Sequence, residues 1–256
     1  MTEQEYRAAD GINKSTLWEM RKSPAHYKYL LEHPAEDTPA LHFGRALHSA
    51  VLTPEAYLTD YVIAPSVDKR TKAGRELYAE WKASLPTGAE ELSAEDAQTI
   101  GEMVEAIKGN KGVMSFLEGT RREVPIFWTD SKTGLPCKCR VDAWGDGTLL
   151  DLKTVTDAMS FERDACNYGY HVQAAHYIDA VWSQTHKVPE WYFIVIEKKP
   201  PYGIRFIRAL PGFLDYGEFI RDELMEKVKE CRDKGEWPSY KAGEISEPKW
   251  ANWEVD

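Results

Sequence analysis

The spacing of apolar residues changes near residue 121 and divides the chain into a helical part and a sheet-containing part. Before that point apolar residues recur three and four positions apart, which is typical of amphipathic helices. This pattern predicts helices within residues 13–33, 38–54 and 93–110. The first of them breaks at Ser23 and Pro24, where serine can cap a helix and proline can begin one. Residues 66–86 combine basic residues with helical periodicity, which fits a solvated loop and helix or a substrate-facing segment.

After residue 121 apolar and polar residues alternate, as they do in strands. The pattern predicts a meander of three strands at residues 122–129, 135–144 and 148–154. A helix at 168–185 follows, then two strands at 191–198 and 203–210, and a last helix at 215–234. No linker interrupts the chain, so we expect one domain over residues 1–256. It would comprise a mainly helical part (1–118), a catalytic sheet with helices (119–234) and a tail (235–256), whose three Trp residues should dock on the body or on a partner.

Composition restricts the class of protein. With 256 residues, 43% of them hydrophobic, the chain can bury a sizeable core. It has no apolar run of roughly 18 residues and no signal-peptide pattern, so we expect a cytoplasmic protein without a membrane partner. Four scattered cysteines fit free thiols in a reducing compartment. The net charge of −10 argues against a nucleic-acid partner unless bound cations or a local basic groove offset it.

Residues 139–154, CRVDAWGDGTLLDLKT, contain the most informative chemistry. If the Asp-Gly pair at 146–147 forms a two-residue turn, the numbers of paired residues sum to 293. Asp142 then lies opposite Asp151 and Arg140 opposite Lys153, on one face of the hairpin. The other face would be apolar and would carry Val141, Ala143, Leu150 and Leu152 together with Cys137 and Cys139.

Two interpretations fit this charged face. Carboxylates roughly 5 Å apart repel by about 3 kcal/mol at an effective dielectric near 20, so the Asp142–Asp151 pair favours a divalent cation between them. Lys153 could then hold or deprotonate an attacking water, or stabilise charge on phosphorus. Alternatively, both acids are solvated on an exposed sheet face and neutralised by Arg140 and Lys153. A register shift of one residue would remove the metal site.

The first acid followed by Asp151-Leu152-Lys153 resembles the motif of PD-(D/E)XK nucleases. The flanking segments LHFGRALHSAVLTPE, which contains His48, and YHVQAAHY, which contains Gln173 and Tyr177, resemble the exodeoxyribonuclease VIII (RecE) nuclease-domain family. The order of these residues is also that of the wider RecB-like group. The likeness extends over nearly the whole chain.

This resemblance implies an α/β fold, an α+β mixed sheet flanked by helices, with a restriction-endonuclease-like core and a helical N-terminal region. It implies catalytic and metal-binding roles for Asp142, Asp151 and His48, a further metal contact from the Leu152 backbone carbonyl, and catalysis by Lys153.

Glu123 matches another acid near the metals of related exonucleases. Gln173 and Tyr177, four residues apart on one helical face, would contact the DNA backbone or support the lysine. Arg45 or the basic residues within 68–75 would line the DNA path. Three of these assignments have simpler alternatives. His48 could be a structural residue, Glu123 a solvated acid at a strand edge, and Gln173 with Tyr177 ordinary helix packing.

The resemblance implies an Mg²⁺-dependent exodeoxyribonuclease, with Mn²⁺ as an alternative metal. It would digest linear double-stranded DNA from 5′ to 3′ and leave 3′ overhangs for a single-strand annealing protein in phage-type recombination. The family also implies a homo-oligomeric ring, a tetramer or trimer, in the cytoplasm of a bacterial host. The cysteine spacing does not fit an iron–sulphur cluster. A structure-specific or restriction-type endonuclease and a non-catalytic DNA-binding subunit remain the alternatives.

Overall fold

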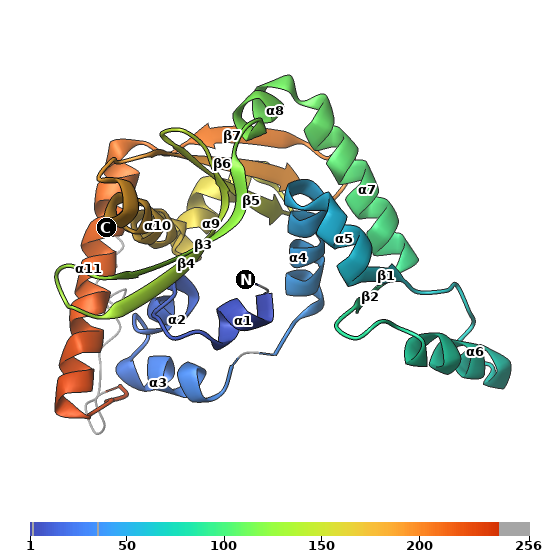
Figure 1. Cartoon of the computed structure of the whole chain (residues 1–256), viewed down its shortest axis with the longest axis horizontal. Coiled ribbons are helices and arrows are strands. Elements are labelled where there is room, and N and C mark those ends of the chain that lie inside the picture. The colour runs from blue at the N-terminus through green and yellow to red at the C-terminus, as the bar shows by residue number, and fades with distance from the viewer. Residues whose placement is uncertain (2, 35, 241–256) are drawn as a thin grey trace, which may run out of the picture.

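A five-stranded mixed sheet lies at the centre of the protein, with helices on both faces (Figure 1). The structure is a computed structural model and describes residues 1, 3–34 and 36–240. The strand order is β3-β4-β5-β6-β7. The strands are β3 (Arg121–Thr129), β4 (Pro136–Trp144), β5 (Thr148–Val155), β6 (Glu190–Glu197) and β7 (Ile204–Arg208). The predicted fold class and all five predicted strands are confirmed.

The connections explain why the sheet is mixed. β3, β4 and β5 follow one another as an antiparallel meander, and β6 and β7 are also antiparallel. β5 and β6 are parallel, because the chain returns between them through η1 (Ala158–Ser160), α9 (Phe161–Asn167) and α10 (Tyr170–Thr185). Parallel neighbours need such a crossover, and here it places α10 against the sheet.

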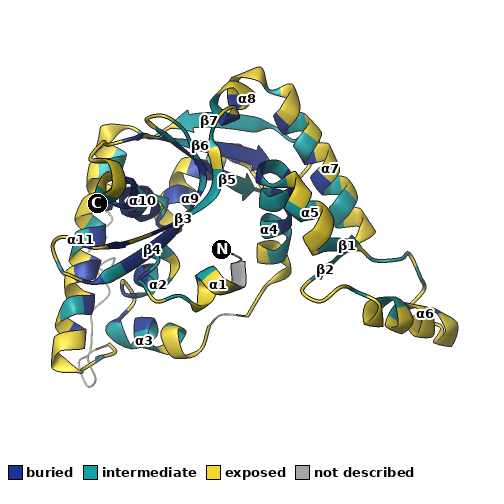
Figure 2. Ribbon diagram, in the orientation of Figure 1, coloured by how far each residue is buried: buried dark blue, intermediate teal, exposed yellow. Residues whose placement is uncertain are grey.

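Each face of the sheet has its own hydrophobic core, and strand residues are buried on both sides (Figure 2). One face, around Trp191 and Phe193, is covered by α2 (Lys14–Glu19), α3 (Pro24–Glu32), α9, α10 and α11 (Pro211–Lys234). The other face, around Leu150, Leu152 and Ile194, is covered by α4 (Pro39–Leu52), α7 (Ala94–Gly109) and α8 (Lys111–Leu117). The strands are therefore interior elements, and polar side chains on them are brought into a low-dielectric setting.

The N-terminal helices begin where their capping residues predict. Ser23 caps α3 (Pro24–Glu32), Thr38 caps α4 (Pro39–Leu52) and Ser93 caps α7 (Ala94–Gly109), each by accepting a backbone N–H bond. α2 (Lys14–Glu19) precedes the predicted break at Ser23. Four short helices were not predicted, namely α1 (Glu3–Ala8), α5 (Pro54–Asp60), α8 and α9. The final helix starts at Pro211, four residues before its predicted start.

Residues 61–92 form an arm that projects from the body (Figure 1). β1 (Tyr61–Ile63) pairs in parallel with β2 (Glu90–Leu92), and α6 (Lys72–Ala83) connects them. Between positions 61 and 91, all of which are described, Gly74 alone is buried. The basic residues predicted to face substrate lie here, but Arg70 pairs with Asp68 and Lys72 with Glu76. Much of their charge is therefore neutralised within the arm.

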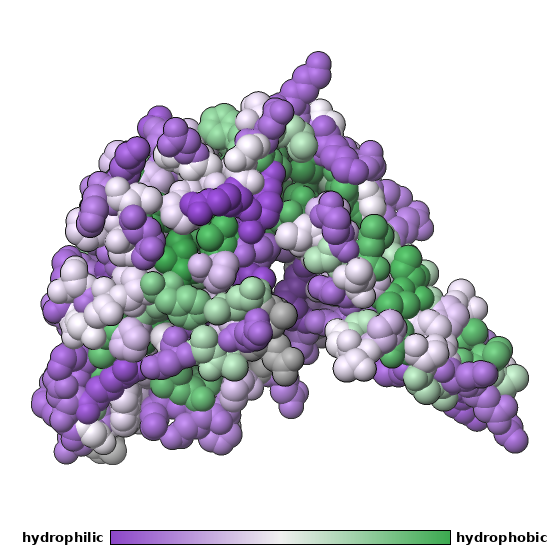
Figure 3. All heavy atoms as spheres, viewed as in Figure 1, coloured by the Kyte–Doolittle hydropathy of each residue, from purple (hydrophilic) through white to green (hydrophobic). Residues whose placement is uncertain are grey.

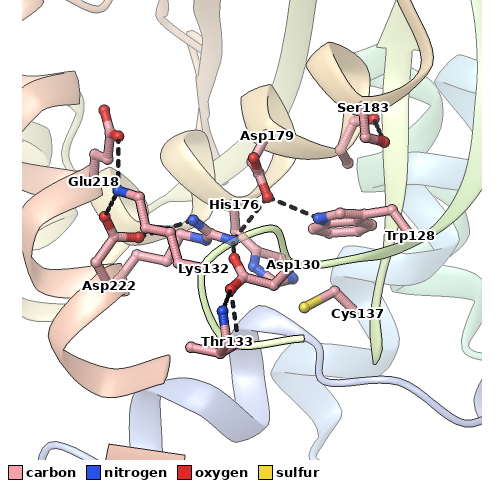
Figure 4. Close-up of polar contacts among 12 residues, drawn as sticks. Trp128, Asp130, Lys132, Thr133, Cys137, His176, Asp179, Ser183, Glu218 and Asp222 are labelled. Atoms are coloured by element: carbon pink, nitrogen blue, oxygen red, sulfur yellow. Dashed lines mark hydrogen bonds and ion pairs between the residues drawn. The ribbon is translucent and has the colours of Figure 1, made fainter. Parts of the chain in front are cut away.

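A buried ionic cluster fixes the β3–β4 connection to the helices of the α10 face (Figure 4). Arg221 of α11, 3% exposed, is ion-paired with Asp130, Asp179 and Asp222. Trp128 donates its indole N–H to Asp179 at 2.7 Å. A buried charge left without its partner is costly, so we interpret this cluster as a structural clamp.

The start of the tail docks on the body. Trp237 stacks on Tyr27 with ring centroids 5.5 Å apart, and Tyr240 contacts His26. This agrees with docking of the tail, although Trp250 and Trp253 lie outside the described residues. Within the described ranges, no helix is both long and apolar enough to cross a bilayer.

Candidate metal centre

The hairpin between β4 and β5 has the turn that the Asp-Gly pair predicts. The Gly145 N–H donates to the Thr148 carbonyl at 2.9 Å, and Gly147 has a φ of +73°, which glycine adopts without strain. The paired residues are Ala143 with Leu150 and Trp144 with Leu149, so the predicted sum of 293 is confirmed at the turn.

The predicted pairing of Asp142 with Asp151 is wrong, because the ladder ends one position earlier. The Leu152 N–H donates to a carboxylate oxygen of Asp142 at 2.8 Å, so a side chain replaces the next backbone partner. Asp151 instead accepts a hydrogen bond from Gln173 of α10. The two acids are therefore held from different sides of the sheet, and Arg140 pairs with Glu123 rather than lying against Lys153.

The single apolar face predicted for the hairpin is also wrong. Cys137, Cys139 and Val141 pack in the core beside α10, whereas Ala143, Leu150 and Leu152 pack in the core beside α4 and α7. β4 therefore changes the face on which its apolar residues lie between Val141 and Ala143. Strict alternation cannot produce this change, so the backbone must be irregular at the residue between them, Asp142.

The neighbouring strand is irregular at the same level. Arg122 pairs with Ala143 and Val124 with Val141, but no pairing joins Glu123 to Asp142. Glu123 has a φ of +48°, a left-handed conformation that costs a non-glycine residue about 1–2 kcal/mol. The interruption of the β3–β4 ladder thus coincides with two acidic residues. Strain of this kind is typical of functional sites, where surrounding structure maintains it.

Three predicted ligands meet at this interruption. Donor atoms of His48, Glu123 and Asp142 all lie within 4.8 Å of one another, and no other such group occurs among the residues that the structure describes. His48 comes from α4, and its Nε2 lies 2.8 Å from the Leu152 carbonyl oxygen. Since a carbonyl can only accept, Nε2 carries the proton. The other ring nitrogen, Nδ1, then faces an Asp142 oxygen at 3.4 Å.

This donor set fits a divalent cation. If His48 is neutral, its Nδ1 and the Asp142 oxygen present lone pairs to each other, an arrangement that requires a proton or a cation between them. Carboxylates and a carbonyl suit Mg²⁺ and Mn²⁺. The Leu152 carbonyl retains a second lone pair beside His48. The residues present can therefore hold the metal that the resemblance implies.

Asp151 and Lys153 form a second, adjacent unit. A carboxylate oxygen of Asp151 lies 2.6 Å from Lys153 Nζ, and Gln173 donates to the other oxygen. Burial, together with the Asp142 charge, raises the pKa of Asp151. Burial alone would lower the pKa of Lys153, but the Asp151 carboxylate, Tyr170 and the Asp142 carboxylate together outweigh it and the pKa is raised. Asp151 is therefore not part of the three-residue group, and binding a cation would require it to turn from Lys153.

Residues 14–247 match the family described as PDDEXK-like domain of unknown function (DUF3799). The chain belongs to this PDDEXK-like family. The predicted PD-(D/E)XK membership is thus confirmed, and the motif acids and lysine lie on the β4–β5 hairpin of its fold.

A solved structure shows the same architecture. A "Putative exonuclease" from Eubacterium rectale superposes with a TM-score of 0.66 at 14% identity, covering 97% of this chain and 95% of that one. An alkaline exonuclease from Laribacter hongkongensis, at 15% identity, covers 75% of this chain and 97% of that chain with a TM-score of 0.31, too low to support conclusions. No curated protein matches the sequence. The first likeness supports the fold alone.

The other predicted residues of this PDDEXK-like chain lie in different settings. Burial raises the pKa of Tyr177 well above its usual range, and the carboxylates of Asp142 and Asp151 contribute in the same direction. Arg45 is held by Asp37 and Glu90, at 2.6 and 2.9 Å. These ion pairs make Arg45 a poorer candidate for a free phosphate contact than the sequence suggested.

Among the residues that the structure describes, no cysteine joins a group that could hold a metal ion. Cys137 and Cys139 are buried in the core beside α10, as predicted for the apolar face of a central strand, and Cys166 is exposed on α9. Burial raises the pKa of Cys137 to about 12, which keeps its thiol protonated.

Sequence reasoning missed two residues beside the Asp151–Lys153 unit. The Tyr170 ring centroid lies 4.7 Å from Lys153 Nζ, and Lys14 Nζ lies 5.5 Å from the same ring. Burial, with the Lys153 charge as the next cause, lowers the pKa of Lys14 to about 7. No sequence spacing links Lys14 to the hairpin, so only the folded chain could identify it.

The molecular surface is hollowed between α1 and α4, where mainly hydrophilic atoms line the opening (Figure 3). α4 carries His48 on the side of the sheet to which Asp142 also turns. Two other hollows, of about 570 and 500 Å³, flank β3 around Arg121 and Trp144 and contain none of the candidate ligands. The candidate ligands, rather than the size of a cavity, therefore identify the hollow near α4 as the opening of the candidate metal site.

Proposed function

We propose that this protein is a metal-dependent DNA exonuclease that digests linear double-stranded DNA from 5′ to 3′. The supporting observation is the His48, Glu123 and Asp142 group at the strained break in the ladder, next to the Asp151–Lys153 pair of a PDDEXK-like fold. The 3′ overhangs would serve a single-strand annealing protein in phage-type recombination within a bacterial cytoplasm.

The site would divide the work between its two units. His48, Glu123, Asp142 and the Leu152 carbonyl would hold Mg²⁺ or Mn²⁺. A divalent cation there would supply Lewis-acid polarisation of a phosphate oxygen. Lys153 would contact a non-bridging phosphate oxygen and stabilise the charge that develops during displacement.

Gln173 would keep Asp151 oriented for this task. Its amide N–H bond to one carboxylate oxygen restricts rotation of the carboxyl group, while Lys153 contacts the other oxygen. When phosphate draws Lys153 away, the second oxygen of Asp151 becomes free to accept another partner. Asp151 would thereby join the cation site that the motif implies, without a large movement of the backbone.

The decisive experiment compares linear with closed circular duplex DNA in Mg²⁺, in Mn²⁺ and in EDTA. We expect digestion of linear DNA alone, and only with metal; 5′- and 3′-labelled ends then report polarity. Asp142→Asn and Lys153→Met should lower the rate at least a hundredfold, whereas Asp146→Asn on the exposed turn should not. Cleavage of circles would indicate the endonuclease alternative, and loss of all metal-dependent cleavage would indicate a DNA-binding subunit.

The proposed ring assembly, a tetramer or trimer, is a separate question. Exposed apolar side chains on and near the arm support self-association: Leu58 is 78% exposed, Ile63 56% and Leu77 57%. A mass measurement in solution tests it, because a monomer of 29.2 kDa is too small to encircle a duplex. A monomer at working concentration would refute the ring and leave the nuclease proposal intact.

A further inference from the structure

Cations and aromatic rings alternate along a track from the candidate site to the surface. Lys153 Nζ lies 4.7 Å from the Tyr170 ring, and Lys14 Nζ lies 5.5 Å from that ring and 5.8 Å from the Trp18 ring. At the other end of the track, the Arg21 guanidinium lies 4.5 Å from the centre of the Trp18 ring. The track thus connects β5 with α2 through the beginning of α10.

The outer end of this track lacks acidic partners. In the described parts of the chain, no carboxylate lies within ion-pairing distance of Lys14 or Arg21, although the net charge is −10. Lys22, one residue beyond Arg21, is by contrast paired with Glu19 at 2.6 Å. Lys14 donates to the backbone carbonyl of Tyr168, so its amino group is held in place without an acidic partner.

The loop between α9 and α10 presents an aromatic surface next to this charge. Tyr168 is 60% exposed, and its ring lies 5.9 Å from that of Tyr170. Gly169, between them, has a φ of +67°, and a Cβ there would lie 2.6 Å from the Trp18 ring. Glycine is therefore required for the loop to lie flat on Trp18, which holds Tyr168 and Lys14 side by side.

We infer that Lys14, Arg21 and Tyr168 form a nucleotide subsite that binds the phosphate and base adjacent to the bond cleaved at Lys153. This inference rests on the proposed function. Lys14 would contact a phosphate oxygen, Arg21 would add positive charge at the same Trp18 ring, and the base would stack on Tyr168. Positive charge interleaved with exposed rings is the arrangement by which proteins bind unpaired nucleic-acid strands. The ligand is therefore a nucleotide of a frayed or single-stranded end rather than the groove of an intact duplex.

The test measures binding of a fluorescent oligothymidylate in Ca²⁺, with Lys14→Met and Tyr168→Ala as variants. Lys22→Met and Tyr29→Ala are matched controls, since Lys22 is already paired and Tyr29 is 63% exposed on α3. Lys14→Met should weaken binding roughly tenfold, because a charge-assisted bond to phosphate is lost. The slope of log K against log salt should fall by about 0.7, as one phosphate contact disappears. Tyr168→Ala should weaken binding at least about fivefold.

Three controls make the outcome decisive. Thermal unfolding shows whether each variant is folded, and Lys14→Arg should restore most of the affinity and the salt slope. Oligonucleotides with 5′-phosphate and 5′-hydroxyl ends distinguish a terminal phosphate from an internal phosphodiester, and a loss with either supports the subsite. If wild type binds and cleaves DNA while Lys14→Met and Tyr168→Ala match it in affinity and slope, the subsite is refuted alone. If wild type binds no DNA, the proposed function fails with it.

Discussion

Replacing Asp142 with asparagine should stabilise the metal-free protein and remove most of the stabilisation that metal provides. Asp142 and Glu123 have oxygens within 4.8 Å of each other. Two unit charges at that distance repel by about 3.5 kcal/mol at an effective dielectric of 20. Both side chains are largely shielded from water, with 13% and 21% exposed, so screening removes only part of this energy. Asparagine removes the repulsion and can still accept the Leu152 N–H with its carbonyl oxygen.

The expected result is a crossover. In EDTA, after allowing for the lost attraction to His48, Arg140 and Lys153, the variant should be more stable than wild type by about 1 kcal/mol. Each kcal/mol corresponds to about 2–4 °C in melting temperature for a chain of this size. Metal at roughly a hundred times its Kd should then stabilise wild type by about 2.7 kcal/mol and the variant far less.

The assay is chemical unfolding in EDTA, in Mg²⁺ and in Mn²⁺, with Asp146→Asn as the control. Asp146 lies on the same hairpin and is exposed at the turn. The same change there should leave the free energy of unfolding in EDTA, and its increase with metal, within about 0.5 kcal/mol of wild type. Equal metal stabilisation of Asp142→Asn and wild type would show that the cation binds elsewhere. A variant less stable than wild type in EDTA would refute the repulsion itself.

Three further predictions concern the frame of the site. Glu123→Gly should be more stable than Glu123→Ala by about 1 kcal/mol, because residue 123 has a left-handed φ. On the same strand Thr129→Gly should be less stable than Thr129→Ala, and urea unfolding of the four variants tests both orders. Gly217→Ala should destabilise by about 1–3 kcal/mol, since its Cβ would lie 2.1 Å from a carbonyl oxygen of α10, while Gly212→Ala, with nothing within 4 Å, should not. Burial lowers the pKa of His176 to about 3, below its usual value near 6.5, so the unfolded chain binds the proton first as pH falls. Stability should therefore decline from pH 6.5 towards pH 3, by roughly 2 kcal/mol at pH 5, and His176→Asn should flatten that part of a pH series of unfolding curves.

The hairpin shows how far sequence alone could lead. The Asp-Gly turn fixes the register of its first two pairs, because turn geometry is local. Beyond the turn, the alternation of apolar and polar residues no longer predicts which face each residue of β4 lies on, and it fails at Asp142. The reason is that the sheet has a hydrophobic core on both faces, so neither face is marked by polar residues. The change of face depends on which helices pack on each side, and that information lies far along the chain.

The same division applies to the site. The resemblance named His48, Glu123 and Asp142, and the structure brings these three together. The subsite proposed around Lys14 had no such signal, because α2 reaches Tyr170 only through the packing of separate elements. The short strands β1 and β2, each of three residues, were not predicted. They are defined by their pairing with each other and are too short to show a hydrophobic pattern.

The arm at residues 61–92 has a consequence for how such proteins diversify. β1 and β2 close its base, with Tyr61 paired to Glu90, and its helix contacts β2 chiefly through Tyr78 and Glu91. Because almost none of it enters either core, insertions, deletions and new sequences here should leave the catalytic sheet folded. Relatives could thus change what the arm touches without altering the chemistry. The same independence makes it a site for limited proteolysis or for grafting a reporter domain.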